Sequence, residues 1–150
     1  HWLLCFFGLS GLALAEAPEE YGRCAACHLP DGAGVPGVFP PIKDRLAQVA
    51  DLPMGREYLV MVVNRGLAGP ITVAGVPYAG MMPGQAGALD STATAKVLNF
   101  VATGLNKSAP DWQPFTEQEV DGVLATHADA DVNQVLNLRQ LLFSQNPELQ

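Results

Sequence analysis

The pentapeptide CAACH, residues 24–28, constrains this chain more than any other feature. It brings the thiols of Cys24 and Cys27 next to the imidazole of His28. Such a group is typical of a zinc site, of a redox-active dithiol or of a covalently attached haem. Each of these three sites requires different residues elsewhere in the chain, so the other cysteines and histidines and the predicted elements decide among them.

The first residues of the chain read as an export signal. Trp2–Ala15 is an uncharged, apolar run that ends in a small-x-small cleavage pattern, and about 14 apolar residues are too few to span a bilayer, which takes roughly 20. We therefore predict that residues 1–15 are a signal peptide, truncated at its start and cleaved after Ala15, and that the mature protein is periplasmic. Cys5 leaves with the signal, so the two cysteines of the pentapeptide are those of the mature chain.

A structural zinc site and a redox-active dithiol both demand residues that the mature chain lacks. Zinc needs four ligands, normally supplied as two pairs. No cysteine follows Cys27, and the remaining histidine after His28 is His127, which lies in an acidic, polar stretch and is expected at the surface. A thioredoxin-like dithiol lies on a helix that follows a strand, and the segment between the cleavage point and Cys24 is too short to supply one. Both sites are therefore disfavoured.

Covalent haem meets each demand. Cys-x-x-Cys-His is the attachment pattern of c-type haem, in which both thiols bond the vinyl groups of one porphyrin and the histidine ligates the iron. Two cysteines of an exported protein ordinarily form a disulfide, but haem attachment consumes both thiols and so explains why these two need not pair. The pentapeptide and the export signal together predict one covalently bound haem c per chain.

Composition and charge exclude one class of partner and leave another open. The 150 residues carry a formal net charge of -7 and lack the cluster of Lys and Arg that phosphate binding needs, so we expect no nucleic acid partner. The hydrophobic content of 49% is ordinary for a single globular domain. The excess of acidic residues is largest after residue 105, where they form either a surface that steers a basic partner or an ordinary solvated surface.

Helical patterns alternate with loops along the mature chain. Capping residues and apolar periodicity predict helices over residues 18–27, 55–67 and 90–104, another from residue 116 to a break near 126–130, and a last amphipathic helix after it. Gly and Pro predict loops over residues 29–41 and 68–88, the second with a brief β-like segment at 71–73, and a linker over 106–114. A long apolar loop is unusual in a compact domain unless it lines something.

Three stretches of the chain resemble class I cytochromes c, the small electron carriers and cytochrome subunits that hold one haem. They are YGRCAACHLPDGAGVPGVFPPI, GLAGPITVAGVPYAGMMPG and VLNFVATGL, and the resemblance covers roughly residues 21–105. It implies an all-α fold of a few helices around the covalently bound haem, over residues 16–105. The remaining residues, 106–150, form an acidic helical extension that exceeds what the minimal fold needs.

The resemblance also implies the two axial ligands of the iron. His28 is the proximal ligand and the thioether of Met82 is the distal one, with Met81 as the neighbouring alternative. A methionine is ordinarily a core residue, but this Met-Pro step lies in a Gly-rich loop with no helix from which to pack. Pro83 favours an extended backbone at Met82, which suits a side chain that projects onto a metal.

Two further contacts of the haem follow from the resemblance. The carbonyl of Pro40 is expected to accept a hydrogen bond from the ring N–H of His28, since a ligating histidine ordinarily donates to a fixed acceptor. Tyr78 resembles the aromatic residue that reaches a haem propionate. The N-terminal helix is clipped relative to the family, so either its contact with the helix over 91–103 is small or part of the apolar run is retained.

With both axial positions filled, the resemblance implies a one-electron carrier and not an enzyme. The carrier is expected to act freely or as the cytochrome subunit of a periplasmic dehydrogenase. Its redox partners would be a donor dehydrogenase and an acceptor oxidase or carrier, and no membrane association is expected after cleavage. Two alternatives stay open: a haem enzyme or gas sensor with a labile sixth ligand, and a docking module in which residues 106–150 matter more than the haem.

Overall fold

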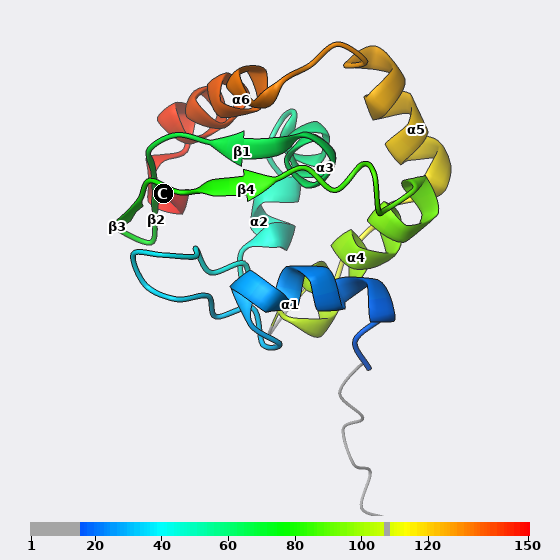
Figure 1. The fold of residues 1–150 in the computed structure, drawn as a ribbon, viewed down its shortest axis with the longest axis horizontal. Coiled ribbons are helices and arrows are strands. Elements are labelled where there is room, and N and C mark those ends of the chain that lie inside the picture. Colours follow the sequence, from blue (N-terminus) through cyan, green and yellow to red (C-terminus); the bar gives the residue numbers. More distant parts are fainter. Residues whose placement is uncertain (1–15, 107–108) are drawn as a thin grey trace, which may run out of the picture.

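The computed structural model describes residues 16–106 and 109–150, so the predicted signal peptide lies outside the described residues. Helices dominate this part of the chain, which also contains four short strands (Figure 1). None of its helices is long and apolar enough to cross a membrane. In chain order the elements are η1 (Glu19–Tyr21), α1 (Gly22–His28), α2 (Leu46–Ala50), α3 (Gly55–Arg65), β1 (Gly66–Ala68), β2 (Ile71–Val73), β3 (Val76–Tyr78), β4 (Met81–Pro83), α4 (Ser91–Gly104), α5 (Glu117–Thr126), α6 (Val132–Gln145) and η2 (Pro147–Leu149).

One hydrophobic core contains side chains from residues 16–105 and from the C-terminal part, residues 106–150. Helices α3 and α4 contribute several fully buried positions, among them Val60 and Leu98. Buried side chains of the C-terminal part belong to the same cluster, and they are Phe115, Val120, Val135, Leu142 and Phe143. Residues 106–150 are therefore held to the rest of the molecule by burial of apolar surface, which is the largest favourable contribution to folding.

Capping side chains explain where the later helices begin. Asp90 and Thr116 each accept a hydrogen bond from a backbone N–H three residues on, at the starts of α4 and α5. Asp131 and Gln134 form a capping box at the start of α6. The three helices predicted from these patterns are all present, and the break between α5 and α6 lies where the sequence indicated it.

The expectation of an all-α fold is too narrow, because the second predicted loop contains strands. β1 pairs antiparallel with β4, and β2 with β3, which gives two small sheets (Figure 1). Ala74 and Gly75 both adopt positive φ and make the tight turn between β2 and β3. Helix α3 ends at Arg65 rather than at Leu67, because Gly66 adopts φ +85° and begins β1. The fold is mainly helical, with two small sheets.

The short N-terminal helix does reach α4. The rings of Tyr21 and Phe100 meet edge to face with centroids 4.9 Å apart, and Glu20 forms an ion pair with Lys96 at 2.6 Å. The Tyr21 hydroxyl donates to the carbonyl of Leu29 at 2.8 Å, and burial raises the pKa of Tyr21 to about 12. Residues of the described part of the chain thus make a contact with α4.

Arg56 of α3 contacts the C-terminal part at Phe115 and Glu119. Its guanidinium donates to both carboxylate oxygens of Glu119 on α5, at 2.6 and 2.7 Å. It also lies over the ring of Phe115, with 3.8 Å between Cζ and the ring centroid. Bidentate pairing together with stacking on an aromatic face is available to arginine and not to lysine.

Candidate functional site

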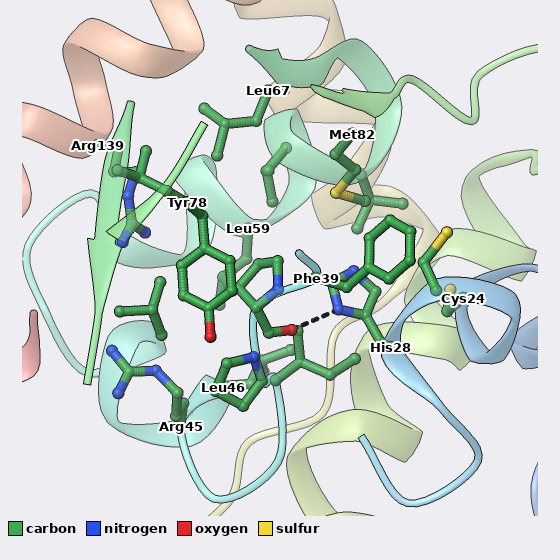
Figure 2. Close-up of a pocket in the computed structure, with 18 of the residues that line it drawn as sticks. Cys24, His28, Phe39, Arg45, Leu46, Leu59, Leu67, Tyr78, Met82 and Arg139 are labelled. Carbon is green, nitrogen blue, oxygen red and sulfur yellow. Dashed lines mark hydrogen bonds between the residues drawn. The ribbon is translucent and has the colours of Figure 1, made fainter. Parts of the chain in front are cut away.

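One pocket lies between α1, the first Gly- and Pro-rich loop, α3 and the strands (Figure 2). It contains about 1340 Å³ of space free of protein atoms, part of which opens to solvent. Its walls are mostly apolar, as is usual for a site that takes a cofactor, with Leu46, Leu59 and Leu67 among them. The side chains predicted to hold the haem all line this pocket, and they are those of Cys24, Cys27, His28, Pro40, Tyr78 and Met82.

Helix α1 presents the pentapeptide to the pocket. Cys24, Cys27 and His28 are three and four residues apart, so they share one face of the helix. Leu29 adopts φ +67° and ends the helix directly after His28. No disulfide joins the two cysteines, and burial raises the pKa of the Cys24 thiol. Both sulfurs lie at one end of the pocket, where they are available for bonds to a cofactor.

The His28 ring is held in one orientation by the first loop. Its Nδ1–H donates to the carbonyl of Pro40 at 2.7 Å, so the lone pair of Nε2 is left to act as a ligand. Burial lowers the pKa of His28, which favours the neutral imidazole that metals bind. Gly34 allows this geometry, because a Cβ built there would lie 2.8 Å from the Pro40 carbonyl oxygen.

Strand β4 distinguishes the two candidate methionines. Side chains alternate along a strand, and the Met81 side chain is 70% exposed whereas Met82 is half-buried and packs against the core. Figure 2 shows the Met82 thioether directed into the pocket that also receives the His28 ring. The register pairs Met82 with Leu67 of β1, which itself lines the pocket.

Two arginines lie at the end of the pocket away from Cys24 (Figure 2). Arg139, which is 8% exposed, donates to the Tyr58 hydroxyl at 3.1 Å and to the carbonyl of Thr72 at 2.9 Å. Arg45 donates to the carbonyl of Leu149. Burial, followed by the nearby positive charge of Arg139, lowers the pKa of Arg45. Within residues 16–106 and 109–150, neither guanidinium forms an ion pair with a carboxylate.

The sequence analysis missed both arginines. Arg45 follows Lys43 and Asp44 after the first loop, and Arg139 is the single cationic residue of α6, so neither belongs to a recognisable motif. No local signal links the two arginines, because 94 positions separate them, and only the fold brings them to one pocket beside Tyr78.

The side chains of the pocket fit a covalently attached haem. Two thiols and an imidazole lie at one end, a thioether enters from β4, and the two arginines lie at the other end, where the carboxylates of a porphyrin could be neutralised. Zinc fits less well, because no group of three or more His, Cys, Asp or Glu side chains among the described residues has the arrangement that would hold a metal ion. His127 was the remaining candidate for a fourth zinc ligand, but its Nε2 lies 3.3 Å from a carboxylate oxygen of Glu57.

Comparison with known proteins identifies relatives. A protein named cytochrome c-552 from Thermus thermophilus is 43% identical over 122 residues, which covers 79% of this chain and 82% of the relative. A second cytochrome c-552 from the same species is 41% identical over 108 residues, again covering 82% of the relative. The cytochrome c subunit of a quinone alcohol dehydrogenase from Gluconobacter oxydans is 37% identical over 100 residues, but the match covers only 20% of that longer protein. No family model matches the chain.

The match to the first relative extends past the region of the sequence motifs. A match over 79% of a 150-residue chain is longer than residues 1–105, so it includes part of residues 106–150. At least part of the C-terminal segment is therefore shared with that relative and is not an addition peculiar to this chain.

Proposed function

Because this chain belongs to the class I cytochrome c family and is an electron carrier with covalently bound haem c, we propose that His28 and Met82 are the axial ligands of its iron. Cys24 and Cys27 would form the two thioether bonds to the porphyrin. The observation that carries the proposal is the pairing of a free Nε2 on His28 with a half-buried Met82 thioether in one apolar pocket.

The side chains of the pocket prepare it for electron transfer. His28 is neutral and held in a single tautomer by Pro40, so it offers Nε2 without a competing proton. Met82 offers a soft sulfur, which favours the reduced state. Haem c, when bound, supplies an iron that gains and loses one electron at a time. The apolar walls exclude water, so little solvent has to reorient when the charge changes.

The cationic end of the pocket supports the expected orientation of the haem. Arg45, Arg139 and Tyr78 would face the two propionates, since they lie away from the cysteines that attach the vinyl edge (Figure 2). A buried guanidinium without a carboxylate partner is costly, and an anionic group of the cofactor would supply that partner. This extends the role first expected of Tyr78 to two further residues.

A carrier, rather than an enzyme, is the activity we propose for this site. Two protein ligands leave the iron no open position for a substrate. The chain would act freely or as the cytochrome subunit of a dehydrogenase in the periplasm, between a donor dehydrogenase and an acceptor oxidase or carrier. The family relatives include both kinds of protein by name, a cytochrome c-552 and a dehydrogenase subunit.

Partners would meet the protein at the mouth of the pocket. Val38 and Met81 line the pocket and are 55% and 70% exposed. Residues 66–89, which supply much of this region, contain no charged side chain. The acidic surface considered from the sequence is therefore not the surface nearest the site, and the contact with a redox partner would be mainly apolar.

Carbon monoxide binding to the reduced holoprotein tests the ligand assignment. The wild-type protein is expected to bind the gas poorly at neutral pH because Met82 occupies the sixth position. Met82→Ala should bind it readily and should lose the far-red absorption band of the ferric protein that reports an iron–thioether bond. Met81→Ala is the matched control, because Met81 is 70% exposed at the mouth of the pocket, and it should behave as the wild type does.

Ready binding by the wild-type protein would instead support a haem enzyme or gas sensor. A far-red band that survives in Met82→Ala and disappears in Met81→Ala would transfer the distal ligand to Met81.

A further inference from the structure

Helix α6 is connected to Met82 through one intervening strand. α6 packs against β1, and β1 pairs with β4, which carries Met82 (Figure 1). Figure 1 shows these three elements side by side, with β1 between the helix and β4. A helix that contributes no ligand is thus placed to determine where a ligand strand lies.

A close approach of α6 to this layer occurs at Gly69, directly after β1. A Cβ built on Gly69 would lie only 2.8 Å from Cδ2 of Leu136, so the half-buried Leu136 side chain occupies the space that any larger residue would fill. Gly69 adopts φ +116°, which disfavours other residues as well. The end of the Leu136 side chain therefore packs directly over Gly69, in the space that a Cβ there would take.

A second contact from α6 holds the same stretch of chain three residues later. Arg139, one turn after Leu136, donates to the carbonyl of Thr72 at 2.9 Å. The backbone from the end of β1 to β2 is thereby held from α6 at both Gly69 and Thr72, so β1 has little freedom to slide.

β4 is in turn fitted closely to β1 and to the end of α3. A Cβ on Gly66 would overlap the carbonyl oxygen of Met82, and a Cβ on Gly84 would lie 2.6 Å from the carbonyl oxygen of Asn64. Gln85 N–H donates to the carbonyl of Val63 at 2.8 Å. A displacement of β1 would therefore also displace β4, because the glycines place no side chain between the two backbones.

We propose that Leu136 is a positioning residue for the axial ligand. By packing over Gly69 it sets the position of β1, and through β1 the depth at which the Met82 thioether enters the pocket. This inference rests on the proposed role of Met82 and assigns a function to the C-terminal helix. Loosening the contact should lower the population in which Met82 is ligated, and an exogenous ligand should then compete more easily.

Imidazole binding to the ferric holoprotein measures that competition. Leu136→Ala is expected to raise the affinity for imidazole by roughly 5-fold or more, the lower end of the usual range for coupling between two sites, and to weaken the far-red iron–thioether band. Leu141→Ala is the matched control, since Leu141 lies on the same helix but is 48% exposed, and it should leave both readouts unchanged. Leu136→Met, which keeps the apolar volume, should restore the wild-type values.

The same measurement in the Met82→Ala background separates positioning from general loosening. There, Leu136→Ala is expected to add nothing, because the residue on which it acts is already gone. An equal gain in imidazole affinity in both backgrounds would overturn the inference, since Leu136 would then control access to the pocket. So would a wild-type affinity in Leu136→Ala.

Failure of the ligand assignment has a different signature. If Met82→Ala itself leaves the far-red band and the imidazole affinity unchanged, the proposed role of Met82 is wrong irrespective of Leu136. Where Leu136→Ala yields too little holoprotein, Leu136→Val, which removes a smaller volume, takes its place with the same expected direction.

Discussion

The residues of the pocket differ in what burial does to each of them. Burial lowers the pKa of His28 and keeps its imidazole neutral, which suits a metal ligand. Arg45 does not respond in that way, because a guanidinium keeps its proton even where burial lowers its pKa. The pocket therefore combines a neutral nitrogen ligand at one end with two permanent positive charges at the other.

These charges should raise the reduction potential, because oxidation of the iron adds positive charge to a poorly solvated site. A unit charge about 10 Å away at an effective dielectric constant of about 20 contributes roughly 1.7 kcal/mol, so we expect Arg139→Met to lower the midpoint potential by about 20–70 mV. Spectroelectrochemical titration of the holoprotein measures this. Arg139→Lys keeps the charge and is expected to retain most of the potential; an equal fall in both variants would point to lost packing instead of lost charge.

At the scale of elements, the site is assembled where glycines let backbones approach closely. Gly34 allows the first loop to present the Pro40 carbonyl to His28. Gly66 allows β1 to lie against the backbone of Met82. Both positions also have positive φ, which glycine adopts without strain. In the sequence these glycines only indicated loops, but in the structure they bring the ligand-bearing segments together.

Gly66→Ala should be much more destabilising than the same change at Gly37. Both glycines have positive φ, +85° at Gly66 and +77° at Gly37. Gly66 combines it with ψ -177°, a region essentially restricted to glycine that costs other residues about 1–3 kcal/mol. Only Gly66 adds overlap with the Met82 carbonyl, whereas a Cβ on Gly37 meets nothing within 4 Å. We expect a total loss of roughly 2–4 kcal/mol for Gly66→Ala, measured by denaturant unfolding of the holoprotein. Equal losses for the two variants would contradict the close contact.

At the scale of the whole molecule, the C-terminal part and the cytochrome region share one core and one pocket. Phe143 belongs to the core cluster and lines the pocket, and Arg139 supplies one of its two cations. Arg45, in turn, is bonded to the carbonyl of Leu149 near the C-terminus. Removal of residues 106–150 is consequently not a clean test of a docking role, because it also opens the core.

A chain ending at residue 105 should fail to accumulate as folded holoprotein. It loses five buried apolar side chains, each contributing about 1.5–3 kcal/mol, and their sum is comparable to the whole stability of a domain, about 5–15 kcal/mol. Haem content and thermal unfolding of the purified protein are the measurements. A chain that ends at Asn146 keeps all five side chains and is the control, expected to fold with its haem. Wild-type stability in the shorter chain would refute the shared core.

The sequence alone determined the features that depend on neighbours along the chain. The pentapeptide, the short helix that carries most of it, and the capped starts of α4 and α5 are local, so spacing and capping chemistry sufficed to predict them. Only the tertiary structure decided the rest. The relative burial of the two methionines, the pairing of strands within the second loop and the meeting of Arg45 with Arg139 all depend on how distant segments pack. A local pattern carries no information about such distant partners.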